Sequence, residues 1–202
     1  MCGGFSIISK KNTLIERFHA DFNFDYTPVS NARPGQNLPV ILAPQRVISL
    51  ARFGYLPHWL NSSSVTGRLP KPVINARAET ISNKPFFKDS FLHRRCLILA
   101  DSFFEWEKEA GGKRQYRILL KTEEPFAFAG VWDELPDNML GFAIITVPAN
   151  SDVLPIHDRM PVILSPDEEE KWLNPNLNQV NAHELLHPSP PGLLQSHPVI
   201  KN

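Results

Sequence analysis

The sequence predicts an α+β fold built mostly from antiparallel β-strands. Short runs of apolar and β-branched residues, the pattern of strands, recur at 47–53, 95–100, 103–108, 115–121, 125–132 and 141–147. Turns rather than helices separate the last five runs, so successive strands are expected to be antiparallel neighbours. Helix start signals lie near the two ends of the chain and predict short helices there.

In the N-terminal half, residues 12–19 are expected to form a short helix that Asn12 caps. Residues 22–46 are rich in Pro, Asn and Gly, which predicts an extended loop region. Residues 61–72 carry Ser, Gly and Pro and predict a polar loop.

In the C-terminal half, the pair Gly111-Gly112 predicts a hairpin turn between two strands. A helix is expected to start at Ser165, with Pro166 and acidic residues in its first turn, and to continue to Leu173. The remaining elements are expected at 161–164 (strand), 182–186 (helix capped by Asn181) and 198–200 (strand).

Length and composition predict a single domain over residues 1–202, because 42% of the residues are hydrophobic and no linker interrupts the pattern. No run of about 18 apolar residues is present, so no membrane-spanning helix is expected. The two cysteines lack metal-site spacing, which predicts neither a disulfide framework nor a metal site, and we expect no cofactor. A reducing, cytoplasmic setting and a monomer are the expectations.

The positive charge is concentrated in one segment, although the whole chain has a net charge of +0. Residues 33–95 hold ten Lys and Arg against Glu79 and Asp89, a net +8, and the rest of the chain carries −8. This asymmetry is compatible with a polyanion site and also with an ordinary solvated basic face.

Cys2 is the residue with the most distinctive chemistry. Removal of Met1, which is common before a small second residue, leaves an α-amine and a thiol on adjacent carbons. Their reference pKa values, about 7.7–8.0 and about 8.5, make both partly nucleophilic near neutral pH. Such an aminothiol can capture an aldehyde as a Schiff base and then close a thiazolidine ring.

Other candidate side chains are scattered along the chain. Asn75 offers an amide for a polar reaction centre, and Arg77 has the fork geometry that suits phosphate. Glu105 lies in a strand between aromatic residues, where its carboxyl group would exchange protons at a raised pKa. His157 is a candidate acid or base, and Arg159 is a second candidate for phosphate binding.

Taken together, these pieces resemble the SOS-response-associated peptidase (SRAP) family over residues 2 to about 173. The matching segments are Met-Cys2-Gly3, NARPGQNLPV at 31–40, FGYLPHW at 53–59, NARAE at 75–79, FEW at 104–106, FAGVW at 128–132, Ile145-Thr146 and HDRMPVI at 157–163.

The resemblance implies a mostly antiparallel, barrel-like sheet with flanking short helices. It also implies that the chain crosslinks to abasic sites in single-stranded DNA through Cys2, as part of the response to DNA damage at the nucleoid. The implied catalytic residues are Cys2, Asn75, Glu105 and His157, and the implied DNA contacts are Arg77, Arg159, Thr146, Pro39 and Gly3.

The chain departs from the family in two places that bear on DNA binding. The usual start is Met-Cys-Gly-Arg, whereas this chain has Gly4, so one cation beside Cys2 is missing and lower DNA affinity is expected. The loop at 61–70 lacks an aromatic residue to separate bases.

Two alternative functions remain open from the residues. In the first, Cys2 and His157 form a peptidase that cleaves at least its own Met1 bond, although no oxyanion-hole signature is visible. In the second, the protein is a non-catalytic single-strand binding module that uses Arg77, Arg159 and aromatic stacking, which leaves the position of Cys2 unexplained.

Overall fold

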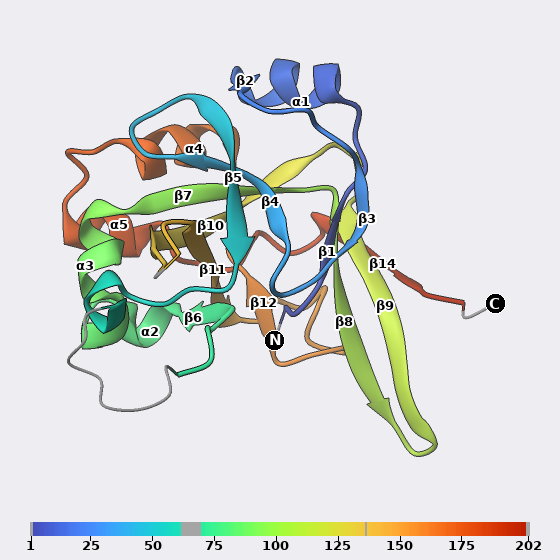
Figure 1. The fold of residues 1–202 in the computed structure, drawn as a ribbon. Coiled ribbons are helices and arrows are strands. Elements are labelled where there is room, and N and C mark those ends of the chain that lie inside the picture. Colours follow the sequence, from blue (N-terminus) through green and yellow to red (C-terminus); the bar gives the residue numbers. More distant parts are fainter. Residues whose placement is uncertain (1, 62–69, 136, 201–202) are drawn as a thin grey trace.

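A closed ring of five β-strands forms the centre of the molecule. The computed structural model describes residues 2–61, 70–135 and 137–200 (Figure 1). The ring runs β11–β10–β7–β4–β5, and β5 pairs back with β11 to close it. Only this closing pair is parallel within the ring. The strands are β4 (Asn37–Leu42), β5 (Val47–Phe53), β7 (Arg95–Ala100), β10 (Phe126–Glu134) and β11 (Leu140–Pro148).

A second, antiparallel sheet lies beside the barrel. Its order is β14–β9–β8–β1–β3. Figure 1 shows the β8–β9 hairpin projecting well beyond the other strands. The strands are β1 (Phe5–Ile7), β3 (Val29–Ala32), β8 (Ser102–Glu109), β9 (Gly112–Leu120) and β14 (Leu194–Pro198).

Aromatic packing fixes β1 against the barrel. Phe5 is fully buried, and its ring meets the rings of Phe53 and Phe128 edge-on at 5.5 and 5.7 Å between centroids. Burial of a phenylalanine of this kind stabilises the fold by roughly 2–3 kcal/mol. The chain immediately before Phe5, which carries Cys2, is therefore held in one place.

Two short strands flank one end of β11. β6 (Asn75–Arg77) pairs with it in parallel, and β12 (Arg159–Pro161) pairs with it antiparallel. Both pairings involve Thr146, which lies opposite Arg77 and Pro161. Segments about 80 residues apart in the sequence are thus brought to the same place.

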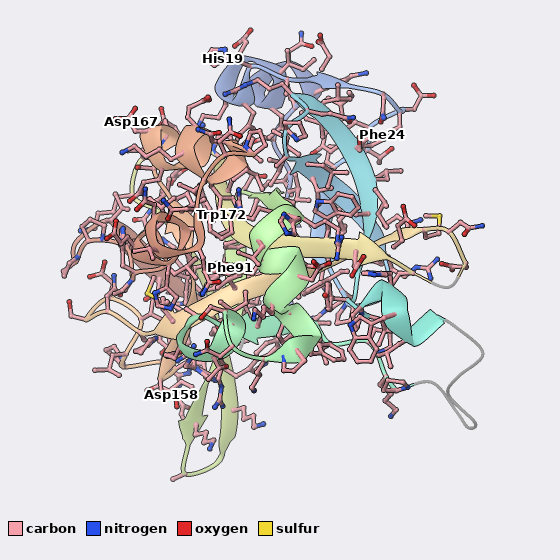
Figure 2. The ribbon with its side chains drawn as sticks, turned by 90° about the vertical axis from the view of Figure 1, so that its left-hand side faces the viewer. His19, Phe24, Phe91, Asp158, Asp167 and Trp172 are labelled. Atoms are coloured by element: carbon pink, nitrogen blue, oxygen red, sulfur yellow. The ribbon has the colours of Figure 1, made fainter. Side chains whose placement is uncertain are left out.

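Short helices cover the outside of the barrel (Figure 2). Phe91 of α3 and Trp172 of α4 pack with ring centroids 6.1 Å apart. The buried guanidinium of Arg95 donates hydrogen bonds to the carbonyls of Phe91, Leu92, Trp172 and Asn174, so it joins the ends of both helices to β7. The helices are α1 (Lys11–Phe18), η1 (His58–Asn61, a 3-10 turn), α2 (Ala78–Ile81), α3 (Pro85–His93), α4 (Pro166–Leu173) and α5 (Gln179–Glu184).

The α+β class, the mostly antiparallel pairing and the short helices are confirmed, and β5 and β7 have the predicted bounds. The loop predicted over 22–46 is wrong, because β3 and β4 form there and the apolar residues of β4 line the buried side of the barrel. The segment 161–164 is divided between β12 and β13 (Ile163–Leu164), which pair with different strands.

Several boundaries also differ from expectation. The N-cap of α1 is Lys10 rather than Asn12, and that of α5 is Asn178 rather than Asn181. The C-terminal strand ends at Pro198 instead of continuing to residue 200. Helices α2 and α3 were not expected, and a further short strand, β2 (Asp21–Phe22), pairs with β5.

The predicted polar loop falls mostly on residues 62–69, which lie outside the described residues. Within the described ranges, none of the helices has the length and apolar character needed to cross a membrane.

Candidate functional site

Cys2 is buried beside the second sheet. Its side chain is 0% exposed, and its thiol donates to the carbonyl of Gly4 at 3.6 Å. The same carbonyl accepts the N–H of Phe104 at 2.9 Å, which ties the N-terminal segment to β8. Burial, and then the charge of Glu105, raises the pKa of the Cys2 thiol well above its usual range, against the hydrogen bond to Gly4.

The register of β1 and β8 brings Glu105 next to this segment. Phe5 pairs with Phe103, so the chain that precedes β1 continues past Glu105. The Glu105 side chain is 1% exposed, and its Oε2 lies 3.9 Å from Nε2 of His157. Burial raises the pKa of Glu105, and the charge of His157 opposes that shift. A raised pKa and an imidazole neighbour suit a proton-transfer pair.

The hydrogen bonds of His157 set its tautomer. Nδ1 accepts the backbone N–H of Arg159 at 2.9 Å, so the neutral ring carries its proton on Nε2, which faces Glu105. Oδ1 of Asp158, on a side chain that is 83% exposed, also lies 2.9 Å from Nδ1. Figure 2 shows Asp158 on the side of the molecule from which the β8–β9 hairpin projects.

Asn75 contacts the Cys2 segment from the barrel. Its Nδ2 donates to the carbonyl of Cys2 at 3.1 Å, and its Oδ1 is buried without a hydrogen-bond partner among the described residues. A buried amide oxygen without a donor is costly, and such a group commonly marks a site that a ligand completes. This acceptor lies next to the residue whose α-amine maturation would release.

Arg159 is engaged by an acidic residue. Its guanidinium forms a two-point ion pair with the carboxylate of Glu79, and Nη2 also donates to the backbone oxygen of Thr146 at 2.6 Å and to its hydroxyl at 3.2 Å. The hydrogen bond from Arg159 lowers the pKa of Glu79. Thr146 is fully buried, so in this structure its side chain supports the arginine and does not face solvent.

Two pockets adjoin the residues that surround Cys2. One, of about 310 Å³, is lined by Glu105, Trp106, Lys108, Lys113 and His157. The other, of about 340 Å³, is lined by Val73, Asn75, Arg77, Lys84, Phe86 and Phe87. Each contains two cationic side chains, which is the charge that a phosphate backbone requires.

The structure brings Cys2, Asn75, Glu105 and His157 together, with Arg77 and Arg159 on adjoining strands. Gly3 is half-buried in the same N-terminal segment. Pro39 is buried within β4, where it lies opposite Leu50 of β5. Cys96 is fully buried in β7.

Some of the Lys and Arg side chains of the basic segment 33–95 are bound within the protein, and others are not. Arg46, Arg52 and Arg94 pair with acidic side chains, and Arg95 binds backbone carbonyls. Arg68 lies outside the described residues. Within residues 2–61, 70–135 and 137–200, no acidic group lies within 4.0 Å of the remaining cations, which are Arg33, Lys71, Arg77, Lys84 and Lys88. About half of the predicted positive charge is therefore available to a polyanion.

Sequence reasoning missed four side chains at the site. Lys108 and Lys113 come from the two strands of the hairpin, and Lys84 precedes α3. Their only sequence signal was their place beside FEW and NARAE. The role of Glu79 as the partner of Arg159 had no local signal at all. In the described part of the chain, no group of three His, Cys, Asp or Glu side chains is arranged to hold a metal ion.

Comparison with known proteins identifies a family. The sequence model of the family described as SOS response associated peptidase (SRAP) matches residues 1–202. The abasic site processing protein YoqW of Bacillus subtilis is 38% identical over 199 residues, covering 93% of this chain and 87% of the relative. The abasic site processing protein YedK of Escherichia coli is 29% identical over 196 residues, covering 92% and 85%. A crystal structure of a protein from Bacteroides thetaiotaomicron superposes with a TM-score of 0.88 at 28% identity, covering 98% of this chain and 92% of that one.

Proposed function

The chain belongs to the SOS response associated peptidase (SRAP) family, and from this premise we propose that it processes abasic sites in single-stranded DNA by a covalent crosslink through Cys2. One observation carries the proposal. Cys2 is buried, and Asn75 donates a hydrogen bond to its carbonyl. The charge of Glu105 acts on the Cys2 thiol, and Glu105 is in turn paired with His157. An aldehyde is the electrophile that an N-terminal aminothiol at such a site captures at two points.

The reaction balances without an oxidant or a cofactor. Hydrolysis of the Met1–Cys2 bond first releases the α-amine. The amine nitrogen attacks C1′ of the ring-opened sugar, and the resulting carbinolamine loses water to give a Schiff base. The thiol then adds across the C=N bond, so that sulfur binds C1′ and the thiol proton passes to nitrogen. Aminothiol and aldehyde become a thiazolidine and one water.

The neighbouring side chains have roles that follow from their contacts. Glu105, whose raised pKa places it closer to neutrality, accepts protons from the amine and the thiol and returns them to the departing hydroxyl. His157 presents Nε2–H to Glu105 and stabilises its charged form. Asn75 holds the Cys2 backbone, and its unpartnered Oδ1 is positioned to accept from the free α-amine. The burial that raises the pKa of the thiol keeps it protonated until the second step.

Single-stranded DNA fits this site better than a duplex. Because Cys2 is 0% exposed, the sugar has to enter a pocket to reach it. Extrusion from a duplex costs a few kcal/mol, and a single strand avoids that cost. Its phosphates remain available to Arg77 and, with displacement of Glu79, to Arg159.

The test uses matched oligonucleotides with one abasic site, with a tetrahydrofuran analogue that lacks the aldehyde, and with an undamaged base. We expect a heat-stable adduct with the first only, at the mass of the protein without Met1 plus the DNA minus one water. The same abasic site in the middle of a duplex should react much more slowly. An adduct on the tetrahydrofuran strand, or active protein that retains Met1, would refute the mechanism.

Self-cleavage by a peptidase mechanism finds less support in the geometry. A peptidase needs a donor at the carbonyl of the bond that it breaks. The amide of Asn75 instead donates to the Cys2 carbonyl, which is on the far side of the Met1–Cys2 bond. If the mature protein hydrolysed unrelated peptides faster than Cys2→Ala does, the peptidase mechanism would be favoured over crosslinking.

A further inference from the structure

The side-chain space beside Gly4 is filled by Arg33, the residue that follows β3. A Cβ placed on Gly4 would lie 3.2 Å from Nη1 of Arg33 and 3.4 Å from the carbonyl oxygen of Ala32. Gly4 is not among the described glycines with positive φ, so its backbone does not itself demand glycine. The small residue leaves room for the guanidinium.

Arg33 is held in this place by its neighbours. The register of β1 and β3 pairs Phe5 with Ala32, which sets Gly4 beside Arg33. The Arg33 guanidinium carbon lies 5.9 Å from the centroid of the Trp106 ring, a cation–π distance. Its backbone N–H donates to Oε1 of Gln36 at 2.7 Å and closes the turn that presents it.

The guanidinium borders the reaction centre. Trp106 forms a wall of the pocket that contains Glu105 and His157. The carbonyl of Gly4 accepts a hydrogen bond from the Cys2 thiol, so the backbone next to Arg33 also positions the nucleophile. Unlike Arg159, Arg33 has no carboxylate within 4.0 Å in the described parts of the chain.

We propose that Arg33 binds a DNA phosphate beside the captured sugar and that Gly4 is small in order to admit it. The proposal rests on the proposed function, because it names a contact to the same substrate. The resemblance implies an arginine at position 4, and here a cation lies beside Gly4 from the residue that follows β3. If Arg33 supplies this cation, Gly4 does not lower the affinity for DNA.

Binding is measured first, with an undamaged single-stranded oligonucleotide that cannot crosslink. Arg33→Ala should weaken binding roughly tenfold at low salt and flatten the slope of log K against log salt by about 0.7. Lys121→Ala is the matched control, since it removes one exposed positive charge at the far end of β9, roughly 25 Å along the strand from Lys113. It should change affinity less than about twofold.

A swap of positions separates the location of the charge from its amount. The double variant Gly4→Arg/Arg33→Ala should recover affinity to within about threefold of the parent, whereas Gly4→Arg alone should not gain affinity because the two side chains compete for one space. With abasic DNA, Arg33→Ala should raise the half-saturating DNA concentration and leave the crosslinking rate at saturation within about twofold.

The results distinguish this inference from the proposed function. An Arg33→Ala protein that keeps its melting temperature and binds like Lys121→Ala overturns the role of Arg33, even if the parent forms the abasic adduct. A parent that forms no aldehyde-dependent adduct overturns the proposed function, and the affinities for undamaged DNA still report on Arg33.

Discussion

Glu79 is expected to restrain DNA binding, and its substitution tests whether Arg159 contacts phosphate. The two terminal nitrogens of the Arg159 guanidinium, Nη1 and Nη2, donate to the Glu79 carboxylate, and the Arg159 and Glu79 side chains are 13% and 46% exposed. A phosphate that reaches Arg159 has to share it with this carboxylate or displace it. Glu79→Gln keeps the shape of the side chain and removes its charge.

The magnitude follows from the geometry. A phosphate charge on the outer face of the guanidinium would lie about 6 Å from the Glu79 carboxylate, where repulsion in a water-like medium is about 0.7 kcal/mol. Its loss strengthens binding about threefold. The guanidinium also regains donors that the carboxylate now uses, which raises the expected gain to between about three- and tenfold. Because the Glu79 side chain is nearly half exposed, solvent screens the ion pair, which contributes about 1 kcal/mol to the free energy of unfolding, so the protein should remain folded.

The assay is equilibrium binding of an undamaged single strand at several salt concentrations. Glu79→Gln should bind more tightly, with a slope of log K against log salt steeper by up to about 0.7. Glu16→Gln, which removes one exposed negative charge on α1, is the control and should stay within about twofold of the parent. If Glu79→Gln bound no better than Glu16→Gln, or more weakly than the parent, Arg159 would not be a phosphate ligand restrained by Glu79.

Four further predictions concern the chemistry and the fold. Glu105→Gln should slow adduct formation on the order of a hundredfold with little loss of DNA affinity. The rate of the parent should rise as pH passes the raised pKa of Glu105, because its carboxyl group then ionises. A Gln variant that retains this rise in a pH–rate profile would exclude Glu105 as the base. Because the folded state holds the Glu105 proton more tightly than the unfolded state does, the parent's free energy of unfolding should fall as pH rises from the usual glutamate pKa to the raised one. The Gln variant should lack that fall in urea titrations. Cys2→Ala should abolish the adduct and Cys96→Ala should retain it, because Cys96 is buried in β7; loss of crosslinking by a folded Cys96→Ala protein would contradict the assignment. Arg95→Met should lower the free energy of unfolding by about 3 kcal/mol or more, because it leaves the helix-end carbonyls that Arg95 binds without donors; a loss below about 1 kcal/mol in urea denaturation would show that Arg95 does not anchor α3 and α4.

The local elements were readable from the sequence because their determinants lie within a few residues. The apolar and β-branched residues of 47–53 and the apolar run that follows Arg95 predicted β5 and β7 with their actual bounds. Ser165 and Glu168 predicted the start of α4, where the glutamate carboxylate accepts the Ser165 N–H at 2.8 Å. The aminothiol chemistry of Cys2 and the core position of Cys96 likewise follow from residue type and immediate neighbours.

The prediction failed over 22–46, where composition favoured a loop. Pro, Asn and Gly in this segment mark turns and a strand start, but the apolar residues of β4 gain their pairing partners from β5 and β7. No short window contains those partners.

Only the tertiary structure determined which scattered residues meet. Asn75 contacts Cys2 across 73 positions, and Glu79 contacts Arg159 across 80. Arg33 occupies the space of Gly4 through the pairing of β1 with β3. Residue types and motifs indicated the chemistry, whereas the contacts depend on strand register and on the closure of the barrel. Register is set by packing among strands far apart in the chain, and that information is not contained in any one of them.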